Sequence, residues 1–180
     1  MGQIRNFAAA CLLLAVAASA QEAFSNKASW VSMAPAPLTT VTRGKPGIVD
    51  LRFQVRPGYH INSNTPKSEY LIPTALKLDA PTDIVIGKIT YPRGQDTSFP
   101  FAPDEKLNVY SGEFTLAVVV HPLHTVLPTK YMVHGQLRYQ ACNNAACYPP
   151  KNLPVEFELK VKKAPPAPRP NPGQSPHVHR

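Results

Sequence analysis

The chain has 180 residues, of which 21 are proline, and its formal net charge at pH 7 is +8. So many prolines disfavour helices, because proline lacks the backbone donor that a helix interior needs. The basic residues are dispersed, apart from a small group at Lys160, Lys162 and Lys163. Dispersed charge is typical of a solvated surface rather than a nucleic-acid-binding stripe, so we expect no nucleic-acid partner.

Residues 1–20 have the three parts of a cleaved secretory signal peptide. Arg5 supplies the positive start, "FAAACLLLAVAA" is a short apolar run, and "ASA" places small residues before a cleavage point at Ala20. Cleavage would remove Cys11 and would lower the formal charge from +8 to +7, since Arg5 is the only charged residue of this segment. No later apolar stretch approaches membrane length. We therefore expect a periplasmic or secreted protein whose mature chain has no transmembrane segment.

Residues 30–163 are predicted to form one domain, preceded by a leader at 21–29, because strand-like alternation runs through them. In residues 47–55 the alternation places Val49, Leu51, Phe53 and Val55 on one face. Residues 131–140 and 153–163 alternate in the same way, and further strands are expected within 29–34, 38–43, 73–79, 83–91 and 112–120. Short strands separated by turn signals indicate an all-β protein, an immunoglobulin-like antiparallel β-sandwich, with a closed barrel as the alternative.

Two segments interrupt the strand pattern. Residues 59–73 are predicted to be a polar loop with embedded aromatics, and residues 91–112 a long connection that carries Phe99 and Phe101. Long connections without secondary structure are uncommon in compact domains and are often functional. The two phenylalanines either serve such a function or pin the connection to the sandwich, and both interpretations stay open on the sequence alone.

Cys142 and Cys147 are the only cysteines of the expected mature chain, and cysteines in an oxidising compartment usually pair. Asn143 and Asn144 favour a turn that would bring the two Cα atoms to about 5.5 Å. A loop this short would stabilise the fold by only about 2 kcal/mol, and a domain of this size does not need it. A disulfide that closes a short loop is also comparatively easy to reduce.

The strand phase of residues 131–142 predicts that Cys142 lies on the polar face, near solvent at a strand end, in phase with Arg138. A nearby guanidinium would favour the thiolate. Three interpretations of the pair remain at this point: a redox pair, a structural hairpin disulfide, or a metal site. A zinc site would need two further ligands, and the available His121, His124 and His134 lack the spacing of such sites.

Residues 164–180 are rich in proline and poor in apolar side chains, so we predict a disordered tail. His177 and His179 could bind a metal ion weakly, but two histidines on a flexible tail fall short of a preformed site. We expect no bound cofactor and no structural metal.

The segment "YQACNNAACYPP", residues 139–150, resembles the active-site segment of the N-terminal periplasmic domain of the thiol–disulfide interchange protein DsbD. That segment has the pattern Tyr-Gln-x-Cys, a short polar insert, and Cys-x-Pro-Pro. "GYHINSNTPKSEYLIPT" and "YPRG…FPF…LNVYSGEFTL" are similar to other parts of the same family. The resemblance runs from about Trp30 to Val161, which is most of the expected domain.

The resemblance implies an immunoglobulin-like domain that exchanges electrons in the periplasm, a protein-disulfide reductase activity without a cofactor. It implies that Cys147 forms the mixed disulfide with a partner and that Cys142 resolves it. Phe99 or Phe101 would be the aromatic tip of a cap loop over the pair. A membrane thiol reductase would donate electrons, and thioredoxin-like proteins, disulfide isomerases or cytochrome c maturation factors would accept them.

The sequence also departs from the family pattern. Four residues separate the cysteines where family members often have five, and acidic residues found near the pair in some members have no assignable match. The chain ends after the domain, so donor and acceptor are both expected in trans. The rival hypothesis is a non-catalytic exported interaction module whose disulfide only rigidifies a hairpin.

Overall fold

The computed structural model describes residues 29–166. The predicted signal peptide, nearly all of the leader, and the tail from residue 167 onward with His177 and His179 lie outside the described residues. Every regular element within 29–166 is a strand. The strands are β1 (Val31–Met33), β2 (Thr39–Thr42), β3 (Gly47–Val55), β4 (His60–Asn62), β5 (Ala75–Asp79), β6 (Ile84–Thr90), β7 (Gln95–Phe99), β8 (Ala102–Tyr110), β9 (Glu113–Pro122), β10 (Lys130–Tyr139), β11 (Ala141–Cys142) and β12 (Lys151–Lys162).

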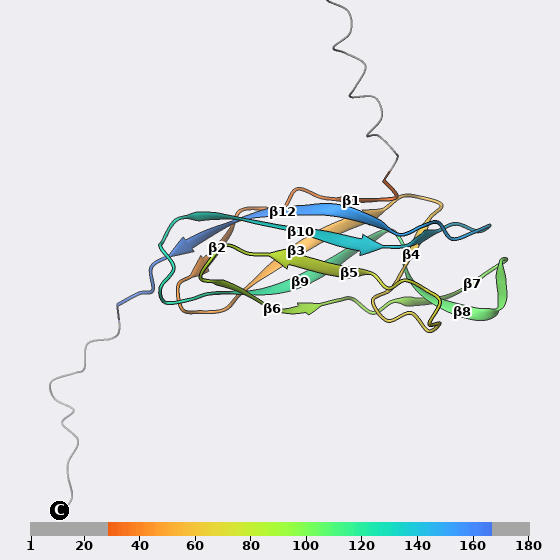
Figure 1. Ribbon diagram of the computed structural model, residues 1–180, viewed down its shortest axis with the longest axis horizontal. Coiled ribbons are helices and arrows are strands. Elements are labelled where there is room, and N and C mark those ends of the chain that lie inside the picture. The colour runs from red at the N-terminus through yellow and green to blue at the C-terminus, as the bar shows by residue number, and fades with distance from the viewer. Residues whose placement is uncertain (1–28, 167–180) are drawn as a thin grey trace, which may run out of the picture.

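These strands form three four-stranded sheets. Sheet A has the order β1-β3-β9-β6, sheet B the order β2-β12-β10-β5, and sheet C the order β11-β4-β8-β7. Sheets A and B make the two layers of the sandwich, with β10 and β12 in front of β3 and β9, and sheet C extends one end of it (Figure 1). Strand pairs are antiparallel except β12 with β2, which is parallel. The immunoglobulin-like β-sandwich is therefore confirmed.

The core lies between sheets A and B and follows the predicted alternation. Each strand that alternates in sequence turns its apolar side inward, because only one face of its sheet is covered. The predicted inward residues of β3, β10 and β12 are buried, apart from the half-buried Leu153 at the start of β12. β9 adds its own inward face to the same cluster. The fully covered side chains of this core include Val49, Leu51, Phe53, Val55, Leu116, Val118, Val133, Leu137, Tyr139, Val155 and Leu159.

Sheet C corrects the prediction of two irregular segments. The connection expected at 91–112 is a hairpin of β7 and β8, in register from the Gln95–Val109 pair to the Ser98–Lys106 pair. Most residues in the outer halves of these strands are exposed, so no apolar alternation marked them in the sequence. The segment 59–73 begins with β4, which pairs with β8 and with β11. The rest of that segment is a loop, closed where the Thr74 amide donates to the Ser63 carbonyl at 3.1 Å.

The chain changes sheets at Gln140. β10 ends at Tyr139 in sheet B, and β11 starts at Ala141 in sheet C. The turn that follows β11 and the β7–β8 hairpin lie at the same end of the sandwich (Figure 1). Within residues 29–166, no helix has the length and the apolar character that crossing a membrane requires.

Candidate functional site

Cys142 and Cys147 are joined by a disulfide, with an S–S distance of 1.99 Å and a Cα–Cα distance of 3.9 Å. The two residues lie directly opposite each other in an isolated antiparallel bridge. Flanking backbone bonds draw the arms together: Asn143 N donates to Ala146 O at 3.0 Å, and Tyr148 N donates to Ala141 O at 2.8 Å. Opposed residues that exchange no bond themselves approach most closely in antiparallel pairs, which explains a separation shorter than the predicted 5.5 Å.

The turn between the cysteines is organised by Asn143. Its side-chain oxygen accepts bonds from the backbone amides of Ala145 and Ala146, both at 2.9 Å, and its amide group donates to the Tyr148 hydroxyl at 2.8 Å. A short amide side chain that bonds its own backbone stabilises such a turn. The structure thus bears out the predicted turn and identifies Asn143 as the residue that holds it.

The predicted exposure of Cys142 is wrong. Its exposed fraction is 0%, whereas Cys147 is only partly buried. The alternation of β10 ends at Gln140, where the chain leaves sheet B for sheet C, so Cys142 does not share a face with Arg138. Arg138 is exposed on β10, opposite Asn152 of β12 and Ala75 of β5. The pair is therefore asymmetric, with one cysteine covered and the other at the surface.

The side of sheet C that carries Cys142 also carries His60 and is covered by Phe99. Cys142 lies directly opposite His60 in the β11–β4 pair, and opposed residues project their side chains to the same face. The Phe99 ring stacks on the His60 ring with centroids 3.8 Å apart. Phe99 is 8% exposed, and Phe101 is 36% exposed and stacks on Phe99 at 5.6 Å. Of the two predicted cap residues, Phe99 covers His60, the residue opposite Cys142, and Phe101 packs on Phe99 nearer the solvent.

His60 is buried and carries no charge at neutral pH. Its exposed fraction is 4%, and burial lowers its pKa from 6.5 to about 4. Its Nε2 atom is buried without a hydrogen-bond partner among residues 29–166. Buried polar atoms in folded proteins are nearly always bonded, and an unpaired one costs about 1–3 kcal/mol. No pattern in the sequence singles out His60, although the segment "GYHINSN" that contains it is part of the family resemblance.

Asn62 and Gln140 tie the loop after β4 to the point where the chain changes sheets. The Asn62 amide group donates to Gln140 Oε1 and to the Ile72 carbonyl, both at 3.0 Å. Gln140 Oε1 also accepts a bond from the Ile72 amide at 3.0 Å. The remaining oxygen of Asn62, Oδ1, is buried without a partner among the described residues. Sequence reasoning missed these roles, because they depend on contacts between segments far apart in the chain.

The arm that follows Cys147 rests on an aromatic cluster of Trp30, Tyr59 and Tyr148. Trp30 stacks on Tyr148 with ring centroids 4.7 Å apart, and Tyr59 lies 6.0 Å from Trp30 and 6.1 Å from Tyr148. The Lys151 ammonium lies 3.9 Å above the Trp30 ring, and the Arg56 guanidinium lies 6.0 Å from the Tyr59 ring. Cations over aromatic faces are attracted to the rings. The surface beside Cys147 is thus aromatic and positively charged.

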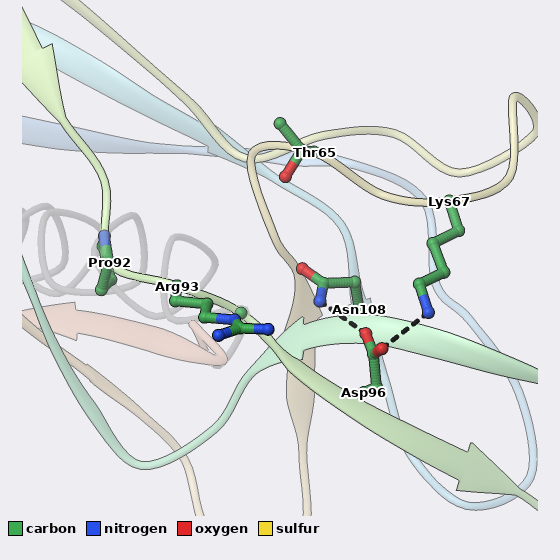
Figure 2. A pocket seen from close by; sticks show the side chains of 7 residues that line it. Thr65, Lys67, Pro92, Arg93, Asp96 and Asn108 are labelled. Carbon is green, nitrogen blue, oxygen red and sulfur yellow. Dashed lines mark hydrogen bonds and ion pairs between the residues drawn. The ribbon is translucent and has the colours of Figure 1, made fainter.

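A separate open pocket of about 510 Å³ contains neither cysteine. Its lining includes Thr65, Lys67, Pro92, Arg93, Gly94, Asp96 and Asn108. Dashed lines in Figure 2 join the Asp96 carboxylate to the Asn108 amide at 2.7 Å and to the Lys67 ammonium at 2.6 Å. These two bonds lower the pKa of the exposed Asp96 carboxyl. Across residues 29–166, no three His, Cys, Asp or Glu side chains gather as metal ligands.

A disulfide between a buried and a partly exposed cysteine is the arrangement that thiol–disulfide exchange requires, and the family match identifies the chain as a domain of this class. The family model described as "Thiol:disulfide interchange protein DsbD, N-terminal" matches residues 27–159. The chain belongs to this family, whose domains are periplasmic. No curated protein matches the chain.

Solved structures of DsbD and ScsB N-terminal domains resemble the chain at low sequence identity. The reduced N-terminal domain of Neisseria meningitidis DsbD is 23% identical, with 61% of this chain and 74% of that chain covered and a TM-score of 0.40. The complex of that domain with the N-terminal domain of PilB from the same organism is 22% identical, with 61% of this chain and 73% of that chain covered and a TM-score of 0.38. The N-terminal periplasmic domain of ScsB from Proteus mirabilis is 14% identical, with 64% of this chain and 42% of that chain covered and a TM-score of 0.44.

Proposed function

We propose that the protein carries electrons between periplasmic thiol–disulfide partners through Cys142 and Cys147. A membrane thiol reductase reduces the disulfide, and the dithiol then reduces an oxidised exported protein such as a thioredoxin-like protein, a disulfide isomerase or a cytochrome c maturation factor. The observation that carries this proposal is the Cys142–Cys147 disulfide within a chain of the DsbD N-terminal family.

The exchange has two steps. The Cys147 thiolate attacks one sulfur of the partner disulfide, which breaks and leaves a thiolate on the partner. Cys142 then attacks Cys147, the mixed disulfide breaks, and the partner leaves as a dithiol. Two electrons pass to the partner, and Cys142–Cys147 is oxidised again. No cofactor takes part.

The difference in burial supports this order of attack. Cys147 is partly exposed beside the aromatic and cationic cluster, so a partner sulfur reaches it first. Cys142 is fully covered and sits directly opposite Cys147, so it is protected from outside thiols but positioned for the second step. Phe99 acts as the tip of the cap, because it covers the side of sheet C on which Cys142 lies.

The test is a mixed-disulfide trap with matched variants in periplasmic extract. Cys142→Ser leaves Cys147 able to attack but unable to be released, so it should accumulate covalent adducts with partner proteins. Cys147→Ser is the matched control and should accumulate few, because its remaining thiol is buried. Equal absence of adducts from both variants would favour the rival interaction module, and so would a reduction potential far below about −300 mV.

A further inference from the structure

We propose that His60 accepts the proton of the Cys142 thiol during resolution of the mixed disulfide, and that Phe99 covers His60 until a partner docks. This inference rests on the proposed function. The disulfide alone does not explain why a histidine with an unpaired nitrogen is buried at this position.

The first observation is the location of the buried polar atoms that lack partners. In the part of the chain that the structure describes, these atoms are His60 Nε2 and Asn62 Oδ1. They lie two residues apart on β4, so both side chains project to the face on which Cys142 lies. Unpaired buried polar atoms are rare, and one explanation of them is a role in chemistry. Their gathering beside the disulfide favours that explanation over a packing defect.

The second observation is the position of His60 relative to the sulfur that must lose a proton. Side chains directly opposite each other on an antiparallel pair have Cβ atoms about 4.5–5.5 Å apart, and His60 and Cys142 are such a pair. In the disulfide, Cys142 has no proton to donate. Reduction creates a thiol, which is a weak donor, next to an imidazole nitrogen that has no other partner among residues 29–166. A hydrogen bond from the Cys142 thiol would give His60 Nε2 the partner that it lacks in the oxidised protein.

The third observation is the cover over His60. Phe99 from β7 stacks on the imidazole at 3.8 Å, and burial is what keeps the pKa of His60 near 4. Displacement of Phe99 would hydrate the ring and return its pKa toward 6.5. Cys142 on β11 is the facing titratable group. On β8, Tyr110 is paired with Ile61, and the Tyr110 hydroxyl donates to Asn64 Oδ1 at 2.6 Å. On β7, the carboxylate of Asp96 is bonded to Lys67 and Asn108. No described carboxylate forms an ion pair with His60.

In the resolution step one S–S bond forms, another breaks and one proton moves. Cys142 sulfur forms a bond to Cys147 sulfur, and the bond from Cys147 to the partner sulfur breaks. The bonding electron pair leaves with the partner as a thiolate. The proton of the Cys142 thiol passes to His60 Nε2 and from there to the partner thiolate or to water, which returns the imidazole to its neutral form.

The test is stopped-flow reaction of the reduced protein with dithiobisnitrobenzoate, followed as a function of pH. Attack by Cys147 releases one coloured thiolate, and resolution by Cys142 releases a second. In His60→Gln we expect the second phase to slow by about 100-fold at neutral pH, while the first phase stays within about two-fold. Because this small reagent does not dock as a partner protein does, Phe99 stays in place, and the wild-type second phase should depend on a group whose pKa lies below the ordinary histidine value of 6.5. His60→Gln should lose that dependence.

His134→Gln is the matched control, because it removes an exposed imidazole that is paired with Glu156, away from the disulfide. Equal second-phase pH profiles for wild type and His60→Gln would overturn the inference, and so would equal slowing of both phases at every pH, which indicates a structural defect. If wild type releases no second thiolate, the proposed function fails and the inference fails with it. Independently, NMR titration should show a higher His60 pKa in Phe99→Ala than in wild type; an unchanged value would refute the role of the cover.

Discussion

The buried imidazole of His60 makes the stability of the oxidised protein depend on pH in a defined window. Burial lowers its pKa from 6.5 to about 4, so between these values the unfolded chain binds a proton that the folded protein does not. Stability must therefore fall as pH falls through this window, by about 1.4 kcal/mol per pH unit. The full loss is about 3 kcal/mol. Above pH 6.5 the imidazole is neutral in both the folded and the unfolded chain, so no stability is lost there. Below about pH 4 it is protonated in both, so the loss of unfolding free energy from His60 does not grow further.

Urea unfolding of the oxidised protein at several pH values between 7 and 4.5 measures this loss. His60→Gln should be less sensitive to pH over that range, whatever its stability at pH 7, and His134→Gln should keep the wild-type dependence. The lowered pKa of Asp96 does not interfere, because its contribution is lost only below its ordinary value of 3.8. The reasoning is refuted if wild type and His60→Gln lose the same free energy of unfolding between pH 7 and pH 4.5.

Three further predictions concern Phe99 as the cover, the disulfide, and the hydrogen bonds that Gln140 accepts from Asn62 and Ile72. Phe99→Ala should speed reduction of the disulfide by dithiothreitol severalfold in a free-thiol assay, and Phe101→Ala should do so less, because Phe101 is 36% exposed; the opposite order would exclude Phe99 as the cover. The double variant Cys142→Ser/Cys147→Ser should lose only about 2 kcal/mol of unfolding free energy in urea, and a much larger loss would support the structural interpretation. Gln140→Ala should lose about 1–3 kcal/mol, because its oxygen accepts two bonds; a thermal scan in which it matches wild type would contradict that role.

The parts of the fold that the sequence predicted well are those in which one face of a sheet is covered. β3, β10 and β12 alternate because solvent lies on one side and the core on the other, and this alternation is visible in a single sequence. Apart from Phe99, β7 and the outer half of β8 are largely exposed, and β4 and β11 are buried throughout. Neither condition produces alternation, so a local pattern could not identify these strands.

The candidate site was predictable only in its covalent part. Compartment and spacing led to the Cys142–Cys147 pair, and Phe99 was among the aromatic candidates for its cover. The burial of Cys142 was mispredicted, because the change of sheet at Gln140 depends on pairing with β4 rather than on neighbouring residues. The same pairing places His60 beside the disulfide, which explains why no local signal could have assigned His60 a role.

The turn between the cysteines is held by hydrogen bonds as well as by the S–S bond. Backbone hydrogen bonds join the two arms on both sides of the pair, and Asn143 Oδ1 accepts two further bonds within the turn. We therefore expect the two sulfurs to stay opposed after reduction, each with a high effective molarity toward the other. A covalent adduct on Cys147 then meets an attacking thiol already in place. Its lifetime should be short, so that a partner is released soon after it is captured and one molecule of the protein can serve many partners in succession.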